Sequence, residues 1–246
     1  MKQFRFAGLL FCAAMVFLLT SCGGNESKEQ TSTDSTTVDS NTDAIMPETN
    51  TIITTPQNMM IVTHKVFDFA KWKVSYDEHD SMRLANGIHS FVIGRGLQDP
   101  DMVLVAVKAD DMEKAKAFAK DPSLKKAMQK GGVTGTPTIS FVTTTWQDTA
   151  LISSPIRSRT TFTVKDWDVW EKNFAAGKQE RLDNGITDRA YGHDADDNKK
   201  ISLVTAVTDT AKAFAYYKSD ALKKRREAGG MIGEPKRFLF RVVQRY

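Results

Sequence analysis

The sequence predicts an α+β protein built from two tandem copies of one β-α-β-β-α-β unit. The hexapeptide RLANGI at residues 83–88 returns as RLDNGI at residues 181–186. At this shift of 98 residues the match runs without a gap from residues 63–137 over residues 161–235. Tryptophans, glycines and prolines keep the register throughout, which low-complexity bias cannot produce. We therefore infer a duplicated domain.

Each element of the first copy has a local signal. Residues 61–66 (IVTHKV) predict a strand by their β-branched content. Asp68 then caps a helix that runs to about Ala85, where Asn86-Gly87 ends it. The remaining predicted elements are a strand at 89–96, a turn at 98–101, a strand at 102–109, a helix from a capping box at 110–113 to Gly131, and a strand at 138–146.

The second copy repeats this order and closes with PKRFLFRVVQRY. This order is that of the ferredoxin-like split β-α-β unit. We place the first unit at residues 58–146 and the second at residues 147–246. Residues 145–158, which include the loop-like QDTALISSP, are the predicted connection.

The first residues have the pattern of a bacterial secretion signal. An apolar run from Phe6 to Leu19 follows two basic residues and is too short to span a bilayer as a helix. It ends in Leu-Thr-Ser-Cys22, which resembles the lipobox, where cleavage leaves an acylated cysteine at the new N-terminus. The alternative is a chance cysteine near an ordinary cleavage site. On the lipobox interpretation, residues 1–21 are a signal peptide and Cys22 carries acyl chains such as palmitate.

The next segment, residues 22–57, is rich in Ser, Thr, Asn and Asp and has little to bury. We expect a disordered tether that holds the folded part near a membrane through its lipid. Gly23 stands where Asp commonly signals retention in the inner membrane. The sequence therefore favours a cell-envelope protein on the outer membrane, at its periplasmic or surface face.

Composition excludes some chemistry. The only cysteines are Cys12, inside the signal, and Cys22, so the mature chain has no thiol for nucleophilic catalysis or metal binding. The formal net charge is +4, and the basic residues gather near the C-terminus. A solvated helix face explains them, and attraction to an anionic lipid or polymer is the alternative. We expect no metal, no cofactor and no nucleic-acid partner.

The motifs of each copy resemble a known family. They are the THKV strand, the Asp-x-x-x-Trp helix ending in Arg-Leu-x-Asn-Gly-Ile, the Lys-Ala-x-Ala helix and the final Gly-Gly-Val-x-Gly-x-Pro of the first copy. Together they resemble the dimeric α/β-barrel superfamily, and within it the small domains grouped with antibiotic-biosynthesis monooxygenases. The resemblance implies that the two units pair their sheets into one barrel within one chain, as a monomeric pseudo-dimer. Haem-degrading enzymes share the superfamily, but their Asn, Trp and His set has no match here.

The resemblance also implies a pocket between the sheet and the helices of each unit. On the first helix, Trp72, Tyr76, His79 and Arg83 lie at spacings of 0, 4, 7 and 11, within an arc of about 60°. Strand alternation adds His64 to the same side. A histidine that titrates near neutrality can remove a proton, and an arginine can hold an oxyanion. The alternative is that both aromatics are core residues and Arg83 caps a helix.

The second copy keeps the tryptophan and arginine of this stripe as Trp170 and Arg181 but has no histidine there. Two hypotheses follow. In the first, the protein is an envelope module that binds a small apolar or aromatic ligand, or a partner protein, with Trp72 and Tyr76 as contacts. In the second, it is a cofactor-free oxygenase or isomerase with His64 or His79 as base and Arg83 holding the oxyanion.

Overall fold

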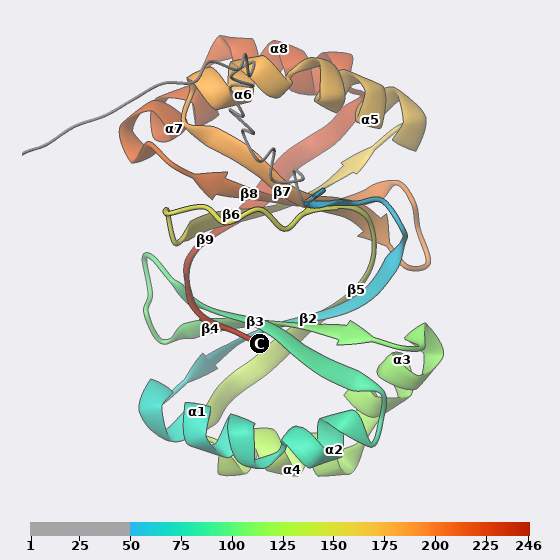
Figure 1. Ribbon diagram of the computed structural model, residues 1–246, viewed down its shortest axis with the longest axis vertical. Helices are drawn as coiled ribbons and strands as arrows, with labels where there is room; N and C mark the ends of the chain where they lie inside the picture. The colour runs from blue at the N-terminus through green and yellow to red at the C-terminus, as the bar shows by residue number, and fades with distance from the viewer. Residues whose placement is uncertain (1–49) are drawn as a thin grey trace, which may run out of the picture. The chain divides into compact units, whose positions relative to one another are not determined.

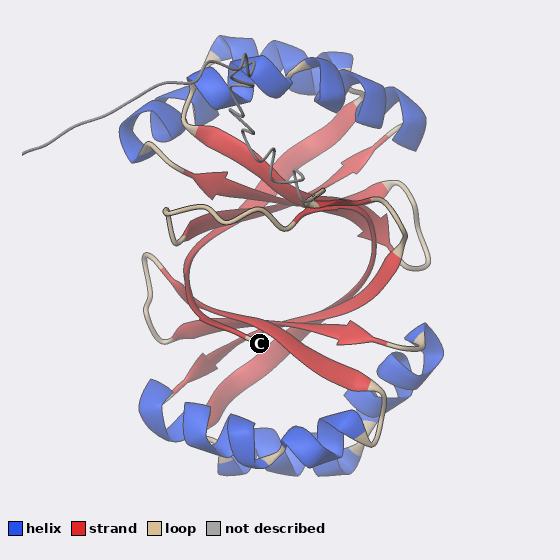
Figure 2. Cartoon of the chain, viewed as in Figure 1, coloured by secondary structure: helices blue, strands red, loops and turns tan. Residues whose placement is uncertain are grey.

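The computed structural model describes residues 50–246, which form an α+β fold of nine strands and eight helices (Figures 1 and 2). The first half of this region contains β1 (Ile52–Ile53), β2 (Gln57–Val66), α1 (Phe69–Glu78), α2 (Asp80–Leu84), β3 (Ile88–Gly96), β4 (Met102–Ala109), α3 (Met112–Lys120), α4 (Pro122–Lys130) and β5 (Val133–Asp148). The second half contains β6 (Ile156–Val164), α5 (Trp167–Ala176), α6 (Lys178–Asp183), β7 (Ile186–Asp194), β8 (Lys200–Val207), α7 (Thr210–Tyr217), α8 (Asp220–Ala228) and β9 (Met231–Arg245).

All strands belong to one antiparallel sheet that closes on itself. The strand order is β1-β5-β2-β4-β3-β9-β6-β8-β7, and β5 also pairs with β7. The long strands β5 and β9 make this possible, because each pairs with its own half along one part and with the other half along another. The result is a barrel whose helices cover the outer face of each half (Figure 2).

The helices begin where short acidic side chains can cap them. Asp68, Asp111, Asp166 and Asp209 each accept a hydrogen bond from the backbone N–H three residues later. Such a side chain satisfies a backbone donor that has no partner within the helix. The first helical segment of each half ends at a glycine with positive φ, as the Asn-Gly pair predicts; Gly87 has a φ of 65°.

Where the sequence predicts one helix, the structure has two short ones. The break between α1 and α2 lies at His79, whose φ of −93° and ψ of 17° leave the helical range. The break between α3 and α4 lies at Asp121, which is extended with a ψ of 129°. Pro122 follows it and disfavours the helical conformation of the preceding residue, and the Asp121 side chain then caps α4. Prediction of a single second helix was wrong for this reason.

The predicted connection at 145–158 was also wrong at both ends. Residues 145–148 continue β5, where Trp146 and Gln147 pair with β7, and β6 begins at Ile156. This pairing joins the two halves of the sheet, and no local sequence signal reports it. Before β2, Ile52 and Ile53 pair with the end of β5, so strand structure begins within the segment expected as tether.

Strand alternation divides the core between two faces of the sheet. In β2, Met60, Val62 and Val66 face the helices of the first half, whereas Met59 and Ile61 face the barrel interior. The helices of the second half cover similar clusters of their own. Among residues 50–246, no helix is long and apolar enough to cross a membrane.

Candidate functional site

The first-half pocket lies between the sheet and the helices of the first half, where the sequence predicts it. Its cavity is about 70 Å³ in volume, and β2, β4 and all four helices contribute to its walls. The structure brings all five predicted site residues to it: His64, Trp72, Tyr76, His79 and Arg83. The rest of the lining is mainly apolar and includes Met60, Val62, Met82, Val105, Phe118, Leu124 and Met128.

His64 is a buried polar group in this wall, with 4% of its surface exposed. It lies on β2, and its ring centroid is 5.5 Å from that of Trp72. Neither ring nitrogen has a hydrogen-bond partner within residues 50–246. Burial disfavours the charged form and lowers the pKa of His64 from 6.5 to about 4. The imidazole is therefore neutral at pH 7, with one donor and one acceptor nitrogen.

Trp72 and Tyr76 form the aromatic side of the pocket. Their rings stack at a centroid distance of 5.2 Å on successive turns of α1. The Tyr76 hydroxyl lies 2.8 Å from Ser90 Oγ, and burial raises the pKa of Tyr76. This phenol is thus already hydrogen-bonded and neutral, and it offers the pocket mainly its ring.

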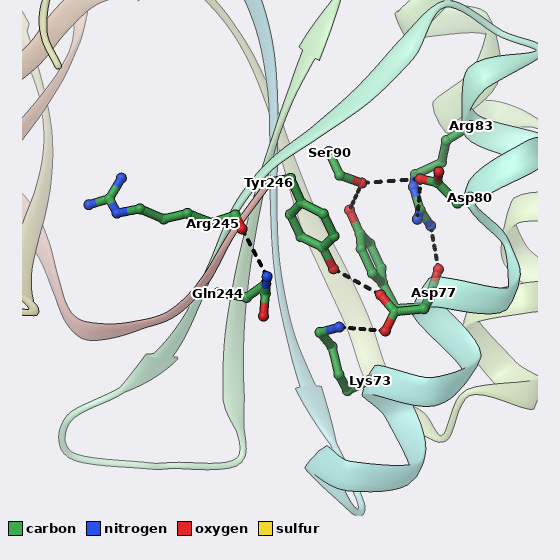
Figure 3. A network of polar contacts seen from close by, with 9 residues as sticks. Lys73, Asp77, Asp80, Arg83, Ser90, Gln244, Arg245 and Tyr246 are labelled. Carbon is green, nitrogen blue, oxygen red and sulfur yellow. Dashed lines mark hydrogen bonds and ion pairs between the residues drawn. The ribbon is translucent and has the colours of Figure 1, made fainter.

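Arg83, on α2, is held by contacts with both α1 and α2 (Figure 3). Its Nη1 donates to the Tyr76 carbonyl at 2.7 Å, and its Nη2 donates to Asp80 at 2.9 Å. The guanidinium also lies 3.7 Å from the centre of the Tyr76 ring. These contacts hold Arg83 across the joint between α1 and α2, whereas its Nε has no hydrogen-bond partner within residues 50–246.

His79 occupies that joint. Its ring Nδ1 lies 2.6 Å from the Ser75 carbonyl oxygen, and the side chain is half-buried at the pocket rim. Of the two remaining histidines in the described chain, His89 pairs with Asp110 on the surface at 3.0 Å and His193 packs edge-on against Trp167. Neither of these lines the first-half pocket.

The second half has a counterpart pocket of about 80 Å³ without a histidine. Phe162 stands in the place of His64, with its ring 5.7 Å from Trp170. Arg181 repeats the role of Arg83: it donates to the Phe174 carbonyl at 2.7 Å and stacks on the Phe174 ring at 3.6 Å. It also makes a buried two-pronged pair with Asp188 at 2.7 and 2.6 Å.

Sequence reasoning missed a larger cavity of about 280 Å³ inside the barrel. Four arginines of the second half line it: Arg157 and Arg159 on β6, Arg189 on β7 and Arg245 on β9. The signal was present in the strand IRSRT, because alternation places two arginines two residues apart on one face. It could be interpreted only once the closure of the sheet made that face an interior.

In this structure the first-half pocket is too small for haem. The first-half pocket is far below the roughly 300 Å³ at which drug-sized ligand sites begin, and a porphyrin is larger than such ligands. Within residues 50–246, no three His, Cys, Asp or Glu side chains gather as a metal site would require. Cys22, the predicted signal peptide and most of the predicted tether lie outside the described residues; only residues 50–57 of the tether are described.

Comparison with solved structures shows the fold. The chain resembles an anthrone oxidase-like protein, with a TM-score of 0.54, 13% identity and coverage of 78% of this chain and 94% of that one. A monooxygenase-like protein of Fusobacterium nucleatum gives a TM-score of 0.51, 11% identity and coverage of 77% and 93%. A mutant chlorite dismutase of Candidatus Nitrospira defluvii gives 0.51, 10% identity and coverage of 76% and 92%.

The α+β architecture thus resembles the dimeric α/β-barrel fold. At such low identity these likenesses show the fold alone. No protein-family model matches the sequence, and no curated protein matches it either.

Proposed function

We propose that the protein binds a small apolar or aromatic molecule in the first-half pocket, with His64 as the polar contact. The observation that carries this proposal is a buried imidazole, without a partner in residues 50–246, in the wall of a mainly apolar cavity. A buried polar group without a hydrogen bond costs free energy. A ligand that supplies the missing partner recovers that cost.

The pocket admits a small ligand and can widen for a larger one. Its volume of about 70 Å³ is about half that of an engineered apolar cavity that binds benzene. Three methionines, Met60, Met82 and Met128, line it. Methionine is unbranched and adapts its rotamers readily, so these side chains can make room for an aromatic ring.

The test compares phenol with toluene, which has the same shape and lacks the hydroxyl. Methyl NMR of the full-length protein labelled at methionine shows where each molecule binds. We expect phenol to shift the signals of Met60, Met82 and Met128 and to bind more tightly than toluene. In His64→Phe, which carries the residue of the second half, this preference should vanish. Equal binding of both molecules to the unaltered protein would refute the role of His64.

The wider context of this site supports a receptor or accessory protein. We infer that the two halves arose by tandem duplication, since they share the 98-residue register, the order of elements and the acidic caps. The closed sheet within one chain supports a monomeric pseudo-dimer. The lipobox-like segment supports anchoring of the mature chain at the outer membrane through lipid on Cys22, with residues between the lipid and the barrel as a tether.

A cofactor-free oxygenase or isomerase is the second candidate, because the structure brings His64, His79 and Arg83 to one cavity. It ranks second since an imidazole with a pKa of about 4 is a weak base at neutral pH. Anthrone is a suitable probe, given the likeness to an anthrone oxidase-like protein. Oxygen uptake with anthrone that His64→Phe abolishes would reverse this ranking. We expect no uptake above that of the buffer.

A further inference from the structure

The barrel cavity has one apolar wall and one cationic wall. Its apolar wall comes mainly from the first half and includes Met59, Ile61 and Phe91. Shifted by 98 residues, these three positions are the arginines 157, 159 and 189 of the second half. One half thus supplies three aliphatic or aromatic side chains at the very positions where the other supplies three guanidinium groups.

The positive charge of this cavity exceeds its negative charge. Within residues 50–246, Asp148 is the only Asp or Glu side chain that lines it, and it pairs with Arg189 at 3.3 Å. Asp148 is further occupied by the Thr51 hydroxyl at 2.8 Å and the Ala150 N–H at 2.9 Å. Arg157 and Arg159 are left without a carboxylate partner among the described residues.

These two arginines are held inside the barrel at a cost. Arg157 is 4% exposed, and its Nη1 donates to the carbonyls of Ser154 and Ile156 at 2.6 and 2.9 Å. Burial and the nearby positive charges of Arg245 and Arg189 lower the pKa of Arg157 to about 10. Arg159 has a pKa lowered to about 10 by burial, and its Nε has no acceptor within residues 50–246. A buried charge without a partner destabilises a fold.

The cavity is also reachable from outside. The linker after β5 contributes Ala150, Leu151 and Ile152 to its lining, and Leu151 is 98% exposed. Arg245 lies at this mouth as well, and Figure 3 shows its side chain extending away from the cluster around Asp77. A ligand entering here meets an exposed leucine and a cation before it reaches the interior.

We propose that the barrel cavity binds a small organic anion: a carboxylate carried on an apolar body. Arg157 and Arg159 hold the carboxylate, since guanidinium groups pair with carboxylates through parallel hydrogen bonds. Met59 and Ile61 pack against the apolar body. This site is separate from the first-half pocket, because β2 turns alternate side chains toward each.

Benzoate and the neutral, nearly isosteric benzamide test the proposal on the full-length protein. Met59 lies in the barrel cavity, while Met60 lies in the first-half pocket, so methionine-methyl NMR distinguishes the two sites. We expect benzoate to shift the Met59 signal and leave Met60 in place, and benzamide to bind at least about tenfold more weakly. Equal affinity for the two molecules, or a shift at Met60 alone, would overturn the proposal.

Matched variants test which arginines bind the carboxylate of the ligand. Arg157→Met combined with Arg159→Ile gives these positions the residues of the first half, and we expect benzoate to bind at least about tenfold more weakly. Arg241→Met removes an exposed arginine of β9 that does not line the cavity, and binding should change less than about twofold. Arg245→Gln, at the exposed mouth, provides a variant that leaves the interior packing intact and should weaken binding severalfold.

Sulfate is an anion without an apolar body, so it tests whether the apolar part of the ligand contributes to binding. Sulfate that binds as tightly as benzoate would mean that the site holds any small anion, and would overturn the amphipathic ligand. Benzoate affinity that is unchanged in both the double variant and Arg245→Gln would overturn the cationic site itself. We expect sulfate to compete only weakly with benzoate.

Discussion

His64 and Phe162 occupy the same place in the two halves, each packed against the tryptophan of the following helix at nearly the same distance. The packing therefore accepts a phenylalanine at this position, and the fold does not require an imidazole. Because His64 is buried without a partner in the described chain, its cost to stability should be visible in the pH dependence of unfolding.

The sign of that dependence follows from the lowered pKa. Between pH 6.5 and about 4 the unfolded state binds a proton that the folded state does not, so stability falls as the pH falls through this window. We expect the unaltered protein to lose about 2 kcal/mol more unfolding free energy than His64→Phe between pH 7 and pH 5. Urea unfolding at both values measures this. His89→Gln, which alters an exposed histidine, should lose as much unfolding free energy between the two pH values as the unaltered protein. If His64→Phe also showed the same pH dependence as the unaltered protein, the burial of His64 would be contradicted.

The two arginines of the helix joints should differ in their effect on stability. Arg181→Met leaves Asp188 buried without a counter-charge, and we expect a loss of about 3 to 5 kcal/mol of unfolding free energy. Arg83→Met leaves Asp80, whose side chain is half exposed, and should cost about 1 to 2 kcal/mol. Urea unfolding of both variants checks the difference. Similar losses would show that the carboxylate partner does not set the cost.

Periodicity predicted which residues share a face but not what each side chain does there. Helical spacing brought Trp72, Tyr76 and Arg83 to one pocket, and alternation placed His64 beside them. The hydrogen bond from Arg83 to the Tyr76 carbonyl spans the break between α1 and α2 at His79. No proline or glycine marks that break in the sequence. In the second half, Gly177 at the same place does mark the break.

At the scale of elements, the order of strands and helices could be predicted because each element carries its own local signal. The strands predicted at 89–96 and 102–109 agree with β3 and β4. The lengths of β5 and β9 could not be predicted, because their far ends are stabilised by strands of the other half. The interior position of the second-half arginines depends on the same closure.

Gly192 tests the pairing of β5 with β7 that closes the sheet. A methyl group at this position would clash with the backbone carbonyl of Thr143. We expect Gly192→Ala to lower the melting temperature strongly and to expose the β5 amides that pair with β7 to hydrogen exchange. Gly233→Ala is the matched control: it has a positive φ of 69° but open space around it, and should cost only about 1 kcal/mol. Unchanged exchange in Gly192→Ala would contradict the closure.

At the scale of the whole molecule, the two halves have different interiors. The first half contributes two histidines to its helix-side pocket and mainly apolar side chains to the barrel. The second half contributes arginines to the barrel and has no histidine in its own helix-side pocket. Both halves therefore have the same fold, but they differ in the polar side chains that they contribute. The first half supplies the histidines of its helix-side pocket, and the second half supplies the arginines of the barrel cavity.

The lipid anchor is a prediction at this scale, since it concerns where the molecule works. Cys22→Ser should abolish incorporation of an alkyne-labelled palmitate in cells and release the protein from the membrane fraction. Cys12→Ser, within the expected signal, should change neither result. Labelling that persists in Cys22→Ser would show that the lipid, if present, is attached elsewhere.

Native mass spectrometry of the mature protein, extracted from its own envelope, tests the ligand-binding role most directly. We expect a retained small molecule in the unaltered protein that is lost in His64→Phe and kept when Arg157 and Arg159 are replaced. A bare protein mass in every sample, or a bound molecule that His64→Phe retains in full, would contradict the first-half pocket as the functional site.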